Sequence, residues 1–143
     1  MHLAQFNIAE AVSNSDDPIM ADFFNNTERI NALADAAPGF IWRLKDDASG
    51  DSYSIKAYDN EFMLINLSVW EDRQSLFNFV YNTDHVEIFK RRKEWFHKMP
   101  KMHMVLWYVE KGHIPTVEEA KERLNYLQQH GESKNAFSFR SKF

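Results

Sequence analysis

The chain has 143 residues and a net charge of −4 at pH 7, and 44% of its residues are hydrophobic and 27% charged. This length and composition predict one globular domain spanning residues 1–143, and the acidic balance argues against nucleic acid or an anionic membrane as a partner. The sequence has no cysteine, signal peptide or long apolar run, which excludes disulfides and thiolate sites and predicts a cytoplasmic protein.

The first part of the chain predicts strands around one helix. Asp17 can cap the start of this helix, Pro18 suits its first turn, and the pair Pro38-Gly39 ends it. Alternation and spacing predict, in chain order, a strand over residues 2–9, a helix over 20–34, a strand over 40–45 and a short hairpin strand over 53–58.

The rest of the chain predicts two further strands and three helices. Asp84 with Glu87, and Thr116 with Glu119, have the spacing of capping boxes at helix starts. We expect a strand over residues 62–70, a helix over 72–82, a helix within 81–96 that starts afresh at Asp84, a strand over 102–109, a helix over 116–130 and a terminal strand or arm over 135–140.

The order of these elements is β-α-β-β-α-β, followed by a C-terminal helix and a terminal extension. This order is typical of the split β-α-β, or ferredoxin-like, arrangement of an α+β protein. In such a fold the helices cover only one face of the sheet.

The two faces of the predicted sheet differ in chemistry. Side chains alternate along a strand, so Phe6, Ile65 and Leu67 belong to a wholly apolar face, while Gln5 and Asn66 belong to a face that mixes amides with aromatics. An apolar sheet face is too large a patch to stay exposed. Because we place the helices over the mixed face, we expect a second copy of the chain to cover the apolar face in a homodimer.

The helix within residues 81–96 places polar side chains in its apolar stripe. At about 100° per residue, Phe89 and Arg92 fall within about 60° of His85. A buried polar group without a partner costs about 1–3 kcal/mol, so the polar groups of this layer must either pair or line a cavity that holds a ligand. They are Gln5, Asn7, Asn31, Asn66, His85 and Arg92.

These residues also have structural interpretations. A lone histidine on an apolar face is more often a hydrogen-bonded core residue, and an internal acid could pair with Arg92. On a helix, the four side chains of the basic run KRRK (90–93) point in four different directions. This indicates that the run is solvent-exposed, except for Arg92, which is predicted to point inward. The other histidines lack the spacing of metal ligands, so no metal site is expected.

The segments AQFNIA, PGFIWRL, NLSVWED, FVYNTDHVEIFKRRKEWF and GHIPTVEEAKERL resemble, in this order, a bacterial family known only as a domain of unknown function. That family is placed in the dimeric α/β-barrel superfamily, whose members include antibiotic biosynthesis monooxygenases and haem-degrading monooxygenases. The resemblance covers nearly the whole chain, and it implies a homodimer with a small-molecule pocket.

Individual positions carry part of this resemblance. Asn66 and Trp70 match an Asn and a Trp, four residues apart, at the end of the third strand of the cofactor-free quinone-forming monooxygenases. Asn7 resembles an Asn on the first strand of the haem-degrading relatives. Phe79 and Phe89 stand where those relatives carry a Trp and an axial His, so the resemblance implies no haem, and no cofactor is expected.

We therefore expect a protein that binds a flat small molecule between sheet and helices. As an enzyme it would be a cofactor-independent monooxygenase acting on an aromatic or enolic substrate, with His85 as general base and Asn66 bonding the enolate oxygen. The alternative is a non-catalytic ligand-binding or sensing protein. RNA-binding modules have the same order of elements. The negative net charge and the lack of the glycine-and-aromatic RNA-binding signature in the third strand argue against this function. The expected substrate-binding residues are Asn7, Asn31, Trp70, Phe89, Arg92 and Trp107.

Overall fold

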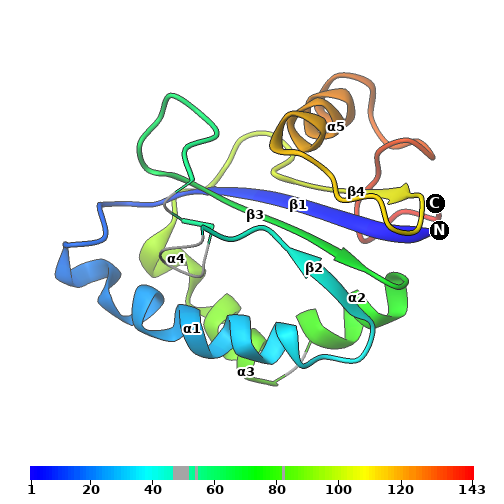
Figure 1. The fold of residues 1–143 in the computed structure, drawn as a ribbon. Helices are drawn as coiled ribbons and strands as arrows, with labels where there is room; N and C mark the ends of the chain where they lie inside the picture. The colour runs from blue at the N-terminus through cyan, green and yellow to red at the C-terminus, as the bar shows by residue number, and fades with distance from the viewer. Residues whose placement is uncertain (47–51, 54, 82) are drawn as a thin grey trace.

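The computed structural model describes residues 1–46, 52–53, 55–81 and 83–143. Figure 1 shows a twisted sheet with α5 on one side and the remaining helices on the other. The elements are β1 (His2–Glu10), a 3₁₀ turn (Pro18–Met20), α1 (Ala21–Asp35), β2 (Phe40–Arg43), β3 (Met63–Trp70), α2 (Arg73–Val80), α3 (Thr83–Lys90), α4 (Arg92–Trp95), β4 (Met104–Val109) and α5 (Val117–His130).

The sheet has the order β2-β3-β1-β4, and its neighbouring strands are antiparallel. This order confirms the predicted ferredoxin-like α+β fold. In the register, Asn7 lies opposite Asn66, and Gln5 lies opposite Ser68. The amides of the two central strands therefore share one face of the sheet.

Local sequence signals explain where several elements begin and end. Asp17 accepts a hydrogen bond from the Ile19 N–H, and Thr116 accepts one from the Glu119 N–H, as the capping patterns predict. Gly39 has φ of 84°, and a Cβ atom there would lie 2.1 Å from Ser75 Oγ. The turn between α1 and β2 therefore requires glycine for both its backbone conformation and its close approach to α2.

The apolar face of the sheet is covered by α5 of the same chain. Phe6, Ile65 and Leu67 are buried in one continuous cluster with Leu124 and Leu127 of α5. Our argument that these sheet residues need a second copy for cover is therefore wrong. The sequence shows an amphipathic C-terminal helix but not that it folds back over the sheet.

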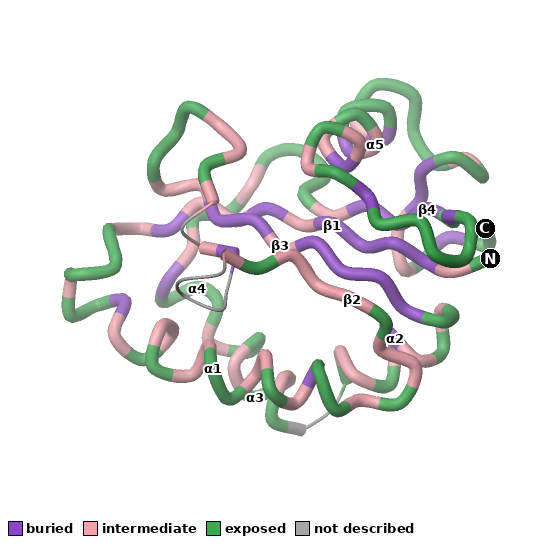
Figure 2. Tube along the Cα trace, viewed as in Figure 1, coloured by how far each residue is buried: buried purple, intermediate pink, exposed green. Residues whose placement is uncertain are grey.

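The opposite face has a divided core. One apolar cluster forms around Leu3, Trp70 and Leu106, and another around Met20 and Trp95. Figure 2 shows that the strands are largely buried, whereas α1 and α3 are mostly intermediate or exposed. This helix layer is therefore less tightly sealed against the sheet than α5 is.

Two predicted elements differ from the structure, and a third adopts one of its two predicted forms. The helix expected within residues 81–96 breaks at Arg91, and α3 begins at Thr83, so that Asp84 lies in its first turn rather than at its cap. The described residues of 53–58 form no strand. The C-terminal segment is an arm, in which Phe137 exchanges two backbone hydrogen bonds with Leu106 of β4, of 2.7 and 3.0 Å.

No helix within the described ranges is long and apolar enough to cross a membrane.

The cover that α5 provides can be tested at two adjacent positions. Leu124 is 2% exposed and faces the sheet cluster, so Leu124→Ala should lower the free energy of unfolding by about 2–5 kcal/mol. Asn125 is exposed on the same helix, so Asn125→Ala should change it by less than about 0.5 kcal/mol. Urea denaturation measures both, and equal effects would contradict this packing.

Candidate functional site

A row of polar side chains crosses the helix-side face of the two central strands. Gln5 is 6% exposed, and its Nε2 donates to Asn66 Oδ1 at 3.0 Å and to Ser68 Oγ at 3.4 Å. The indole Nε1 of Trp70 also donates to Ser68 Oγ, at 3.0 Å. These bonds satisfy most of the row within the chain, which is the pairing that its burial requires.

Asn66 keeps one free polar atom in this row. Its Oδ1 accepts from Gln5, whereas its Nδ2 donates no hydrogen bond to any residue that the structure describes. Asn66 is also only partly buried, unlike Gln5 and Ser68. It can therefore donate a hydrogen bond to an acceptor outside the chain.

Aromatic rings continue the row from the sheet to α3. Trp70 stacks on Phe79 of α2 with ring centroids 5.3 Å apart and an interplanar angle of 27°. Phe79 in turn lies 5.2 Å from the ring of His85. The sequence predicts that Asn66, Trp70 and His85 share a site, and the structure links them in one row through Gln5, Ser68 and Phe79.

His85 is held in one neutral form. Its Nδ1 lies 2.9 Å from the Val80 carbonyl oxygen at the end of α2, and because a carbonyl only accepts, Nδ1 carries the proton. Burial lowers the pKa of His85, and the bond to Val80 opposes this shift only in part. Nε2 is then an unprotonated nitrogen, and no described residue bonds to it. Such a nitrogen can accept a proton from a ligand.

Two predicted residues lie near this row without a hydrogen bond of their own to a described residue. Asn7 pairs with Asn66 across the strands and is partly buried, and Asn31 on α1 is partly buried as well. Their roles as ligand contacts remain predictions.

Arg92 and Phe89 are not directed inward, contrary to the prediction. Arg92 is exposed, donates to the Phe89 carbonyl at 3.2 Å and lies 4.2 Å from the Phe89 ring centroid, and Phe89 is itself 53% exposed. The break at Arg91 changes the helical phase, so the periodicity that placed Arg92 beside His85 does not hold. An anionic group of a ligand in this layer would not meet Arg92.

Trp107 lies on the wrong face for the predicted site. The register of β4 places it opposite Ala4, within the cluster covered by α5, where its Nε1 donates to Glu119 Oε2 at 2.9 Å. It is fully buried and acts as a core residue.

The sequence analysis did not assign Ser68 and Phe79 to the site. Ser68 alternates with Asn66 and Trp70 along β3, so a period of two already placed it on their face. The sequence analysis mentioned Phe79 only because it stands where the haem-degrading relatives carry a tryptophan. The Val80 carbonyl is a backbone group and leaves no sequence signal.

Two surface hollows lie away from this row, beside α5. One has a volume of about 370 Å³ and contacts Tyr58 and Leu124, and the other, of about 430 Å³, contacts Ile55 and Val117. Both border Lys121, whose Nζ donates to the Ala57 carbonyl at 2.6 Å. The expected hollow between sheet and helices is not one of these two.

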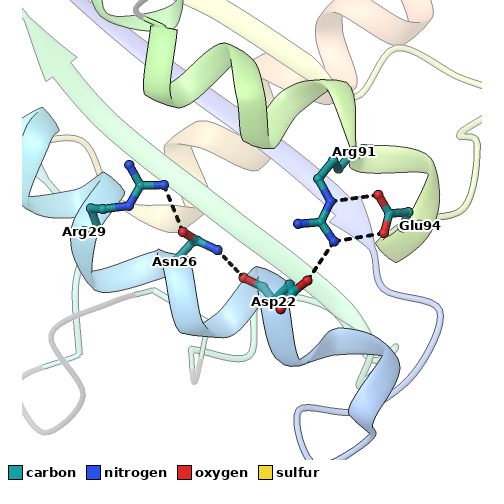
Figure 3. Close-up of polar contacts among 5 residues, drawn as sticks. All are labelled: Asp22, Asn26, Arg29, Arg91 and Glu94. Atoms are coloured by element: carbon teal, nitrogen blue, oxygen red, sulfur yellow. Dashed lines mark hydrogen bonds and ion pairs between the residues drawn. The ribbon is translucent and has the colours of Figure 1, made fainter.

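Charged residues tie α1 to the helix segment that carries His85. Figure 3 shows Arg91 bonding to Asp22 of α1 at 2.8 Å and to the carboxylate of Glu94. Arg91 lowers the pKa of Glu94 by donating hydrogen bonds to it. Arg29 on α1 also lies 3.3 Å from Asp84, the residue before His85. These exposed pairs fix the position of α3 more than they stabilise the chain.

The described residues include no group of three or more histidine, aspartate or glutamate side chains placed to hold a metal ion. Within the row itself, Asn66 offers a hydrogen-bond donor to a ligand and His85 offers an acceptor.

The lowered pKa of His85 predicts a pH dependence of stability. The unfolded chain binds a proton at the ordinary pKa of 6.5, while the folded chain binds it only at lower pH, so stability is lost as the pH falls through 6.5 toward the folded pKa. His85→Gln should reduce this loss, whereas His97→Gln, at an exposed position, should not. Urea denaturation at several pH values measures it, and a wild type that gains stability over His85→Gln in acid would contradict the shift.

Comparison with known proteins supports the fold. Residues 2–143 match the family described as "Domain of unknown function (DUF3291)", and no curated protein matches the chain. The solved structure of a conserved protein from Methanosarcina mazei Go1 is 14% identical and covers 77% of this chain and 94% of its own, with a TM-score of 0.53.

Two further structures are similarly distant. SnoaB, a cofactor-independent oxygenase from Streptomyces nogalater, is 14% identical and covers 76% of this chain and 93% of its own, with a TM-score of 0.50. The NE2512 protein of unknown function from Nitrosomonas europaea is 14% identical, with 80% and 95% covered and a TM-score of 0.51. At this identity the similarities show the fold alone, and the family match shows that the chain belongs to the DUF3291 family.

Proposed function

We propose that this protein binds a flat, partly apolar small molecule at the row formed by Asn66, Trp70, Phe79 and His85. The observation that carries the proposal is the pair of free polar atoms on partly buried residues, Asn66 Nδ2 and His85 Nε2. These residues are the two ends of a row that runs through Gln5, Ser68, Trp70 and Phe79. Few convergent polar groups in an aromatic wall are typical of small-molecule sites. The complementary ligand presents an acceptor oxygen to Asn66 and an acidic O–H or C–H group to His85.

The reaction that best suits these atoms is cofactor-independent oxygenation of an aromatic or enolic substrate. Neutral His85 removes a proton from the substrate through Nε2, and the N–H of Asn66 stabilises the negative oxygen of the resulting enolate. The enolate transfers an electron to dioxygen, and the resulting radical pair joins through a C–O bond, which becomes a hydroperoxide when the proton returns. Cleavage of its O–O bond with loss of water leaves one oxygen in the product as a carbonyl group, so the substrate supplies all the electrons. That the oxygenase SnoaB has a similar fold is consistent with this chemistry but does not establish it here.

The alternative is a ligand-binding or sensing protein without turnover. It is favoured by the extent to which Gln5, Ser68 and Trp70 already satisfy one another, since such a row needs no substrate to complete it. Both functions use the same residues, and turnover separates them.

Dioxygen consumption with a panel of enolisable aromatic ketones and phenols tests the proposal. His85→Ala should lower the rate by about 10²–10⁴-fold because it removes the base. Asn66→Leu should lower it by about 10²–10³-fold because it removes the enolate's hydrogen-bond donor. His97→Ala, at an exposed histidine, should leave the rate unchanged.

Binding measured on the same panel by tryptophan fluorescence distinguishes the outcomes. Binding that depends on Asn66 and His85, without dioxygen consumption, would support the sensing alternative. Absence of both binding and consumption would contradict the site itself.

We also propose that the chain forms a homodimer, now through a different surface. Partly buried apolar residues border the α5-covered cluster, where the two hollows could receive side chains of a second copy. These residues are Trp42, Leu44, Ile55, Tyr58, Met63 and Met99.

Sedimentation velocity tests the dimer at micromolar concentration. Leu44→Glu places a charge among the apolar residues of the proposed interface and should give a monomer. Lys45→Glu, at the exposed neighbouring position, should leave the dimer intact. A monomeric wild type would contradict the proposal.

A further inference from the structure

Arg73, the first residue of α2, has an incompletely paired guanidinium group. Its Nη1 donates to the Ser141 carbonyl of the C-terminal arm at 2.8 Å, and its Cζ lies 5.2 Å from the centroid of the Phe137 ring. Its Nε and Nη2 are buried and have no hydrogen-bond partner among the described residues. These two nitrogens form one edge of the guanidinium plane.

This arrangement is unfavourable for a cation on its own. A guanidinium keeps its charge in proteins, so burial cannot be relieved by loss of a proton. Arg73 also occupies the first turn of α2, where the aligned peptide dipoles create positive potential, and that turn contains no acidic residue. Burial and missing partners therefore favour an anion at this edge, whereas the Asp72 cap already offsets the helix dipole.

The two carboxylates next to Arg73 in sequence do not supply that anion. The Asp72 carboxylate accepts a hydrogen bond from the Ser75 N–H at 2.8 Å as the cap of α2. Glu71 is exposed and makes no ion pair with a described residue. The structure thus leaves a prepared cationic edge beside the arm.

We propose that the Nε/Nη2 edge of Arg73 binds the carboxylate group of a small-molecule ligand. The two N–H groups on this edge are parallel and match the two oxygens of a carboxylate, which gives a bidentate pair. The Phe137 ring and the Ser141 carbonyl hold the guanidinium plane in place on its other sides. The proposal goes beyond the function proposed above and does not depend on turnover.

The position of Arg73 relates this site to the aromatic row. Phe137 belongs to the same apolar cluster as Trp70, three residues before Arg73. Arg73, unlike Arg92, therefore adjoins the apolar cluster on the helix side of the sheet and can meet the anionic end of a ligand there. An aromatic carboxylic acid is the ligand class that fits both the ring surfaces and this edge.

The C-terminal arm covers the site and should respond to its occupancy. Phe137 is paired with β4, Phe139 packs edge-on against Phe77 at 4.9 Å, and the Tyr108 hydroxyl donates to the Phe143 carbonyl at 3.4 Å. Nε and Nη2 are buried, so a ligand reaches them only when the segment that contains Ser141 moves aside. Binding should therefore change amide hydrogen exchange in residues 138–142.

Calorimetric titration of the full chain with benzoate, acetate and inorganic phosphate tests the site. We expect wild type to bind benzoate and the binding to weaken at least tenfold in Arg73→Lys, which keeps the charge but lacks the planar fork. Arg73→Met should abolish binding. Arg140→Met, at an exposed arginine of the same arm, should bind like wild type.

Each other result would overturn the proposal. Equal binding by wild type and Arg73→Met would place the anion elsewhere, and binding of phosphate alone would exclude the carboxylate class. Lack of any binding by wild type, with Glu71→Gln as destabilising as Arg73→Met, would show that Glu71 pairs with Arg73 in solution. The two Arg73 variants are compared by their response to ligand, so a change in their basal stability does not affect the comparison of their binding.

Discussion

The amide of Gln5 joins the two central strands on the helix-side face, and the geometry of the proposed site depends on it. Its Nε2 bonds to Asn66 Oδ1, which leaves the Nδ2 of Asn66 free to donate. The same nitrogen reaches Ser68, whose Oγ accepts from the indole of Trp70. One buried side chain therefore orients both the hydrogen-bond donor and the aromatic surface that a ligand would contact.

Features encoded over a few residues were predictable from the sequence. The alternation along β1 and β3 separates the two sheet faces correctly, and the caps at Asp17 and Thr116 form as their spacing predicts. The fold follows from the order of these elements. The place of α5 does not, because its amphipathic pattern is compatible with packing on either its own sheet or a partner's.

The errors in the site come from long-range information that a sequence pattern lacks. Helical periodicity places Arg92 beside His85 only in an unbroken helix. The helix breaks at Arg91, whose backbone has φ of −91° and ψ of 5°. Trp107 could be assigned to a face only with the register that pairs it with Ala4. His85 is partly buried because it contacts Phe79 and the Val80 carbonyl of α2. The unpaired edge of Arg73 depends on the arm's path, which no local pattern predicts.

The two faces of the sheet contribute differently to stability and to function. On the α5 side, a continuous apolar cluster holds the strands together. On the other side the clusters are divided, and α1 meets α3 and α4 through exposed ion pairs and through the smaller apolar cluster that contains Phe23, Ile88 and Trp95. Local opening of α1 and α3 therefore costs less than global unfolding, and a ligand can reach Asn66 and His85 while the α5 side keeps the sheet intact.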